Sequence, residues 1–116
     1  FMRHHNTKRK FGRETNQRRA LMKSLAVNLI KNDKIKTTEA KAKELRPFIE
    51  KLVTKAKAGD LAKRKLVISA IGILSTKKLF DKIAPKYKDR NGGYTRITKM
   101  PRRKSDGSKI SVIEFV

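Results

Sequence analysis

The side chains of this chain that could act on a partner are mainly lysines and arginines, and many of them lie in two clusters. Thirty-two lysines and arginines stand against ten aspartates and glutamates, which gives a formal net charge of +22 over 116 residues. The first thirteen residues hold five basic residues and no acid, and Arg102, Arg103 and Lys104 form the second cluster. Guanidinium and ammonium groups pair with phosphate, and a charge of this size opposes compaction unless a polyanion neutralises it. We therefore expect a nucleic-acid partner.

Histidines and carboxylates lack the spacing that acid–base or metal chemistry needs. The only histidines, His4 and His5, are adjacent, so either a helix or a strand would point them in different directions. Most carboxylates fall at expected helix starts or beside lysines on expected helix faces, where they support a helix without catalysis. No cysteine is present, which excludes disulfides, thiolate metal sites and cysteine nucleophiles. We expect no enzyme, no metal site, no cofactor and no small-molecule substrate.

Length and composition predict one domain with a modest core. Only 37% of the residues are hydrophobic, but they recur at regular spacing after residue 14. We therefore divide the chain into a basic, nucleic-acid-binding arm over residues 1–14 and a single folded domain over residues 15–116. No apolar stretch approaches the length that spans a bilayer, so no membrane partner is expected.

Hydrophobic periodicity and capping residues predict four helices. The first begins at Thr15 or Asn16, ends near residue 32 and turns a row of leucines at 21, 25 and 29 toward the core. The second covers residues 39–58, with Thr38 as its cap and a kink at Pro47 or a break near residue 46. Gly59 ends it and Asp60 caps a third helix over residues 61–71. A fourth begins at residue 75 or 76, after an interruption at Gly72, and ends at residue 85.

Three strands complete the prediction. Residues 33–38, 94–100 and 110–116 alternate with β-branched residues, and the last two strands form a hairpin with a long loop over residues 101–109. Asn91, Gly92 and Gly93 form a strong turn signal; they lack the flanking strand, lysine and hydroxyl of a phosphate-binding loop. The expected fold class is α+β, in the order helix, strand, three helices, two strands.

The sequence favours a folded RNA over DNA. It has no Cys/His finger spacing and no heptad zipper after a basic region, and its few aromatic residues form no evident stacking platform. The remaining binding mode is one in which the protein fits the shape of the RNA and contacts its phosphates through the arm, a basic loop and helix ends. A free protein that compacts DNA or RNA is the main alternative, and an accessory to an RNA-modifying enzyme is a third reading.

A set of short motifs resembles a known family over about residues 2–116. These motifs are Met2-Arg3-His4, Phe11-Gly12-Arg13, Arg18-Arg19-Ala20-Leu21, Ile35-Lys36-Thr37-Thr38, Ala40-Lys41-Ala42-Lys43-Glu44-Leu45-Arg46-Pro47, Gly92-Gly93-Tyr94-Thr95-Arg96-Ile97 and Ile113-Glu114-Phe115-Val116. Together they resemble the bacterial-type large-ribosomal-subunit protein family numbered seventeen in the L series. The resemblance implies a structural role: binding and stabilising large-subunit rRNA near the peptide exit region, beside neighbouring large-subunit ribosomal proteins. It also implies helices packed on a small mixed β-sheet. The location that it implies is cytoplasmic, in a bacterial ribosome, or else in an organellar ribosome.

Charge and resemblance together give the candidate RNA-binding residues. The resemblance supports those before residue 14 and those from 90 to 96, whereas those after residue 101 rest on charge. They are Arg3, His4, His5, Lys8, Arg9, Lys10, Arg13, Arg18, Arg19, Lys36, Arg90, Asn91, Gly92, Gly93, Tyr94, Arg96, Arg102, Arg103 and Lys104.

Overall fold

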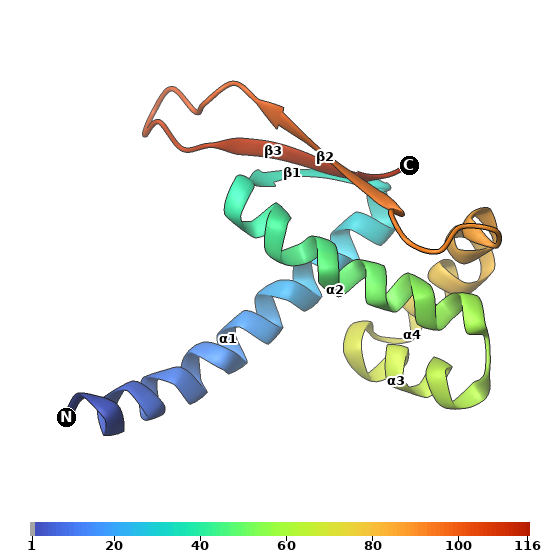
Figure 1. The fold of residues 1–116 in the computed structure, drawn as a ribbon, viewed down its shortest axis with the longest axis horizontal. Coiled ribbons are helices and arrows are strands. Elements are labelled where there is room, and N and C mark those ends of the chain that lie inside the picture. The colour runs from blue at the N-terminus through green and yellow to red at the C-terminus, as the bar shows by residue number, and fades with distance from the viewer. Residues whose placement is uncertain (1) are drawn as a thin grey trace.

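A computed structural model of the chain describes residues 2–116, with side chains from residue 15 onward. It contains four α-helices and three strands, joined after the fourth helix by a π-helical and a 3₁₀ turn (Figure 1). The elements are α1 (Met2–Asn32), β1 (Lys34–Thr38), α2 (Glu39–Ala58), α3 (Leu61–Ile71), α4 (Ile73–Lys78), the π turn (Leu79–Ile83), the 3₁₀ turn (Ala84–Tyr87), β2 (Thr95–Met100) and β3 (Ile110–Phe115). The predicted α+β class is confirmed.

The three strands form one antiparallel sheet in the order β1-β3-β2. In one cross-strand row Ile35 of β1 lies opposite Ile113 of β3, which in turn lies opposite Ile97 of β2. The mixed sheet predicted from the sequence is therefore wrong. Both outer strands are antiparallel to the central strand β3. A hairpin joins β2 to β3, and β1 pairs antiparallel with β3, so the sheet has no parallel pair of strands.

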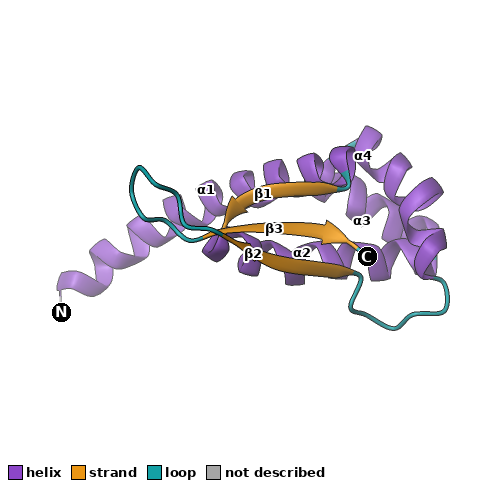
Figure 2. Cartoon of the chain, turned by 90° about the horizontal axis from the view of Figure 1, so that it is seen from above, coloured by secondary structure: helices purple, strands orange, loops and turns teal. Residues whose placement is uncertain are grey.

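The helices cover one face of the sheet, and α2 lies at the centre of the packing (Figures 1 and 2). Its buried side chains are those that the periodicity predicts, spaced three or four residues apart: Ala42, Leu45, Ile49, Leu52, Val53 and Ala56. The predicted caps are also present: Thr38 accepts from the Lys41 N–H, and Gly59 ends the helix in the left-handed region. The predicted break near residue 46 is absent, because burial on both sides of Pro47 outweighs its missing N–H.

Helix α1 differs from the prediction in its start and its rotation. It begins at Met2, so the start predicted at Thr15 or Asn16 is wrong. The row that faces the core is Met22, Ala26 and Ile30, with Leu29 beside it, whereas the predicted leucines 21 and 25 are only half-buried. The small Ala26 side chain lets the neighbouring elements approach closely, which explains a buried row shifted by one residue.

Helix α4 also starts earlier than predicted. Gly72 (φ 88°, ψ 168°) interrupts the helix for a single residue, and α4 begins at once with Ile73. Thr76 is buried and donates its hydroxyl back to the Gly72 carbonyl (2.6 Å), so it does not cap the helix. The chain then continues past Pro85, the predicted end, because Pro85 lies in the first turn of the 3₁₀ segment, where no N–H donor is needed.

Candidate nucleic-acid interface

The glycine loop, as we call residues 88–94, is held on α2 by contacts of Lys57, on α2, with Arg90 and Tyr94 of the loop. Lys57 of α2 donates from Nζ to the Arg90 carbonyl and to Tyr94 Oη (3.1 Å). Its ammonium group also lies 5.0 Å from the centre of the Tyr94 ring, a cation–π contact. The Thr54 hydroxyl lies 3.3 Å from Tyr94 Oη. The hydrogen bond with Thr54 lowers the pKa of Tyr94 most, and the hydrogen bond from Lys57 lowers it further. The loop therefore has a built-in anchor.

Tyr94 itself is not at the surface. It is 1% exposed and its ring packs against that of Tyr87, with 5.2 Å between the ring centres. It was predicted among the RNA-binding residues, and the structure gives it the position of an anchor beneath the loop. Its effect on a bound RNA would be exerted through the loop it holds.

The glycine loop presents its polar groups outward. Gly92 (φ 132°) and Gly93 (φ 63°) adopt backbone angles that other residues rarely take, and Arg90 donates from Nη1 to the Gly93 carbonyl (3.1 Å). Arg90 and Asn91 are exposed. Beyond the loop, Glu50 of α2 accepts from both the N–H (3.3 Å) and the hydroxyl (2.9 Å) of Thr95, which fixes the start of β2.

A groove of about 490 Å³ lies between α2 and the glycine loop. Lys51 and Lys55 from α2 line it together with Asn91 and Gly92 from the loop. Two lysines of α2 thus line one open groove with the backbone of the loop, and Glu50 lines it as well. Neither lysine was among the candidates from the sequence, because only the fold places them opposite the loop.

The outer face of the sheet is also basic. Lys34 of β1, Glu114 of β3 and Arg96 of β2 lie in one cross-strand row, with Lys36 in the next row on the same face. Arg96 donates to Glu114 from Nε (3.2 Å) and Nη2. This hydrogen bond, with the nearby charge of Lys34, lowers the pKa of Glu114. Two cations thus flank one carboxylate, so the row keeps a net positive charge, and Lys36 adds another cation in the next row.

The hairpin loop (residues 101–109) is closed by its own acid. Asp106 accepts from the Ser108 N–H (3.0 Å) and pairs with Arg103 (3.4 Å), and the Ser108 bonds lower its pKa. Arg102 and Lys104 are exposed on the same loop. Arg103 is thus partly neutralised within the loop, whereas the carboxylate defines the shape in which the other two cations are displayed.

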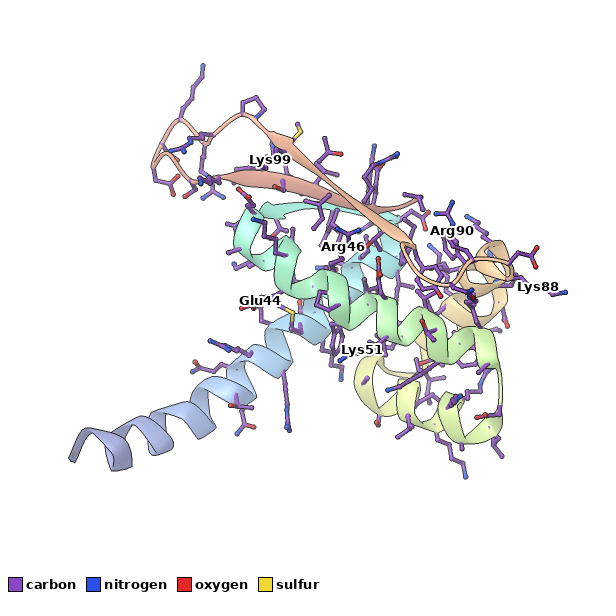
Figure 3. All side chains as sticks on the ribbon, in the orientation of Figure 1. Glu44, Arg46, Lys51, Lys88, Arg90 and Lys99 are labelled. Carbon is purple, nitrogen blue, oxygen red and sulfur yellow. The ribbon has the colours of Figure 1, made fainter. Side chains whose placement is uncertain are left out.

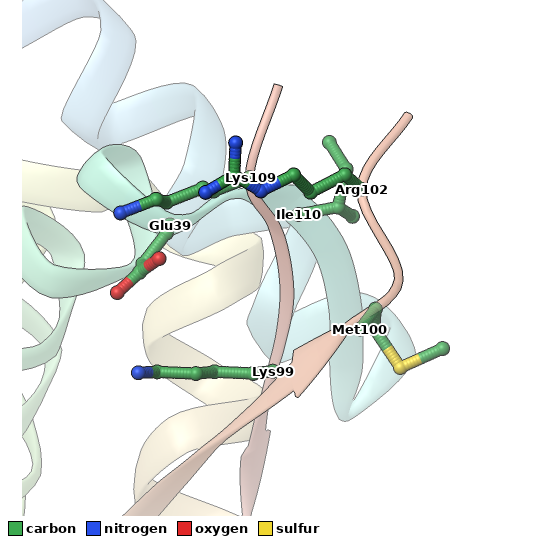
Figure 4. Close-up of a pocket in the computed structure, with 6 residues that line it drawn as sticks. All are labelled: Glu39, Lys99, Met100, Arg102, Lys109 and Ile110. Atoms are coloured by element: carbon green, nitrogen blue, oxygen red, sulfur yellow. The ribbon is translucent and has the colours of Figure 1, made fainter. Parts of the chain in front are cut away.

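A small pocket of about 270 Å³ lies where the hairpin loop meets the start of α2 (Figure 4). Lys99, Arg102 and Lys109 line it together with Glu39, which pairs with Lys43 at 3.0 Å. The Lys43 hydrogen bond lowers the pKa of Glu39, with smaller contributions from the charges of Lys99 and Lys109. Lys99 and Lys109 were not predicted as site residues, since strand pairing brings them to the start of a helix far away in the sequence.

The fold distributes the predicted residues over an extended surface. The glycine loop and the hairpin loop lie at opposite ends of β2, a strand of six residues, so roughly 20 Å separates them. Figure 3 shows this separation, with Lys88 and Arg90 at one end and Lys99 toward the other. Lys36 and Arg96 lie on the sheet between them, and Arg18 and Arg19 are exposed on α1. The remaining candidates lie outside the described side chains: Arg3, His4, His5, Lys8, Arg9, Lys10 and Arg13.

This arrangement suits binding to a phosphate backbone. Among residues 15–116, no group of three or more His, Cys, Asp or Glu side chains could hold a metal ion. The described carboxylates include Asp60, which caps α3 through the Lys63 N–H (2.8 Å). No helix in the described part of the chain is long and apolar enough to cross a membrane. An extended surface with several spaced cations can contact several phosphates at once.

Comparisons with known proteins find one family. The model of the family "Ribosomal protein L17" matches residues 21–116. A protein named large ribosomal subunit protein bL17 from Hydrogenobaculum is 50% identical over 117 residues, which cover 99% of this chain and 99% of that protein. Proteins of the same name from Sphingopyxis alaskensis and Clostridium acetobutylicum are 52% identical over 116 residues and 50% identical over 109 residues. The first match covers 99% of this chain and 84% of that protein, and the second covers 93% of this chain and 96% of that protein.

Proposed function

Because the chain belongs to the ribosomal protein L17 family, we propose that it binds and stabilises large-subunit rRNA through its two basic loops and the sheet between them. Membership of this family makes the chain a structural constituent of the large ribosomal subunit and not an enzyme. Its relatives are bacterial ribosomal proteins, and the bacterial ribosome is a cytoplasmic particle.

One observation carries the proposal: exposed cations lie at both ends of a single sheet, on loops that hydrogen bonds hold in place. The glycine loop is bonded to α2 through Lys57, and the hairpin loop is closed by Asp106. A large folded RNA offers phosphates at fixed positions, so cations on a rigid frame bind it with less loss of conformational freedom than cations on a flexible tail.

The arm and the location within the subunit extend the proposal. Residues 1–14, with their five cations and no acid before Glu14, would contact rRNA beyond the sheet and apart from the hairpin loop, since α1 projects away from the sheet (Figure 1). The resemblance of the motifs supports a position near the peptide exit region, among other large-subunit proteins.

A salt series on defined complexes tests the proposal. We expect the protein to co-sediment with large subunits through a high-salt wash. Its affinity for isolated large-subunit rRNA should fall by several orders of magnitude between roughly 50 and 200 mM salt if about ten phosphates are neutralised. Equal retention on duplex DNA and on rRNA, with loss from subunits in the wash, would instead favour the free nucleic-acid-compacting protein.

A charge-matched pair of variants locates the interface. The double variant Lys36→Gln/Arg90→Gln removes one cation from the sheet and one from the glycine loop. The control Lys77→Gln/Lys82→Gln removes two exposed cations after α3, outside the sheet and both loops. We expect the first to lower the salt slope of rRNA binding by about 1 to 2 and the control to leave it nearly unchanged. Equal slopes for the two variants would refute this interface.

A further inference from the structure

The second half of the helical layer exposes apolar side chains that the core does not use. Leu66 of α3 is 55% exposed, and Ile73 and Leu74 of α4 are 70% and 85% exposed. Single exposed leucines are ordinary on a protein surface, but a contiguous group of large apolar residues marks a contact site. These residues lie within nine positions of one another in the chain, on two successive helices.

Local structure holds these side chains outward. In α3, Val67 and Ile71 face the core and the half-buried Ala70 packs against it, whereas Leu66 turns outward. Gly72 then interrupts the helix for one residue, and α4 begins with Ile73 and Leu74. The interruption is fixed by Thr76, which is buried and whose N–H (3.1 Å) and hydroxyl (2.6 Å) both donate to the Gly72 carbonyl. The exposure is therefore a property of the folded state and not of a frayed helix end.

Ala70 also lines a groove between α1, α2 and α3. The groove has a volume of about 330 Å³ and is lined by Ala20, Phe48 and Ala70, with Arg19 and Lys23 from α1. Phe48 is half-buried and packs against the core from the other side. We call the residues Leu66, Ala70, Ile73 and Leu74, with this groove, the apolar surface of α3 and α4.

The charges decide what can cover this surface. An RNA backbone offers phosphates and no apolar group, so it would not bury Leu66, Ile73 and Leu74 against an apolar surface. A second copy of the chain would bring together two molecules of charge +22, which repel each other. The cations at the edge, Arg19 and Lys23 on the groove and Lys65 and Lys77 beside the exposed leucines, instead match acidic groups.

We propose that the apolar surface of α3 and α4 binds another protein of the large subunit, one that presents an apolar segment flanked by acidic residues. This inference rests on the proposed function, since the partner is sought within the same particle. It separates two sides of the molecule: the sheet and its loops bind rRNA, and the helical layer opposite the sheet binds protein.

Oxidative footprinting tests the contact, with Leu61 as an internal reference. Leu61 is 67% exposed on the same helix as Leu66 but is rotated from it by about 140° about the helix axis. In the free protein all four residues should be oxidised by hydroxyl radicals. In assembled large subunits we expect Leu66, Ile73 and Leu74 to be protected about tenfold and Leu61 far less. A photo-reactive phenylalanine analogue at position 74 should cross-link to a protein chain rich in acidic residues near the cross-link.

A substitution separates docking from RNA binding. The variant Ile73→Ser/Leu74→Ser should keep the melting temperature and the rRNA affinity of the parent, because both side chains are exposed. We expect it to dissociate from subunits about tenfold faster than the parent in a high-salt wash, where charge contacts are screened, whereas Leu61→Ser should not. A parent that never joins the subunit would refute the proposed function and this contact with it. A parent that joins while positions 66, 73 and 74 stay fully accessible, or cross-links only to RNA, would refute the contact alone.

Discussion

Lys57 should be more important to the protein than any exposed lysine, although it does not need to contact RNA. It is half-buried on α2 and contacts the glycine loop in three ways: hydrogen bonds to the Arg90 carbonyl and Tyr94 Oη, and the cation–π contact with the Tyr94 ring. Replacing Lys57 by Met keeps most of the length of the side chain and removes all three contacts. The substitution therefore tests whether the loop depends on this anchor.

The magnitude follows from these contacts. A hydrogen bond from a charged donor contributes about 1.5–3 kcal/mol when buried, and a cation–π contact about 0.5–1 kcal/mol at an exposed site. Because water reaches part of Lys57, we take the lower end of each, and two hydrogen bonds with one cation–π contact then give a loss of about 3.5 kcal/mol in the free energy of unfolding. For a domain of this size that lowers the melting temperature by roughly 8 °C or more. The loss is present in the free protein, before any RNA is added.

Lys51→Met is the matched control. Lys51 is an exposed lysine on the same helix and lines the groove between α2 and the glycine loop, so both variants lose one charge near the loop. We expect Lys51→Met to leave the melting temperature unchanged, or to raise it slightly by reducing repulsion. The assays are thermal melts of the free proteins and rRNA titrations at two salt concentrations. If both variants melt alike and weaken rRNA binding alike, Lys57 is only one more surface cation and the anchor proposed here is refuted.

Three other substitutions follow from the structure. Ile49→Ala, at a fully buried position on α2, should lower the free energy of unfolding by about 2–5 kcal/mol in denaturant titrations while rRNA affinity per folded molecule stays constant. Arg96→Ala should raise the pKa of Glu114 toward its ordinary value of 4.5, which an NMR titration of the carboxyl carbon detects. Because the pKa of Glu114 is lower in the folded state, the Arg96–Glu114 pair stabilises the fold above the unfolded pKa, and this contribution is lost as the pH falls through the folded pKa. Arg96→Ala should therefore make the free energy of unfolding depend less on pH below about pH 5. Replacing Arg9, Lys10 and Arg13 of the arm together by alanine should leave the melting temperature unchanged or raise it, and should weaken the rejoining of the protein to large subunits. A triple variant that unfolds but still binds rRNA tightly would contradict the division of the chain at residue 14.

Local signals allowed most of the fold to be predicted. The buried positions of α2 follow from its apolar spacing, and Gly59 and Asp60 mark the turn into α3 by their own backbone and side-chain chemistry. The hairpin of β2 and β3 follows from two alternating segments with a polar loop between them. Each of these features is decided within about twenty residues of sequence, where propensity and capping act directly.

The errors arise where distant contacts decide the structure. The π turn and the 3₁₀ turn form because Leu79, Ile83 and Tyr87 reach the core there, and no local signal marks this detour. The strand directions depend on β1 pairing with β3, about 75 residues away in the chain. For the same reason the cations that strand pairing or helix packing brings into the site, such as Lys34 and Lys57, were missed, whereas cations in basic runs were found.

The few acids of this chain explain how so large a positive charge becomes a shaped surface. Glu50 fixes the start of β2, Glu114 pairs across the sheet with Arg96, and Asp106 closes the hairpin loop. Such exposed pairs add little stability by themselves. Their positions matter more, since each holds a piece of backbone from which neighbouring cations project. A chain with the same net charge and no such pairs would attract any polyanion equally, whereas cations held at fixed separations bind best where phosphates recur at those separations. The physical basis of selectivity for a folded RNA is therefore the placement of the acids as much as the excess of bases.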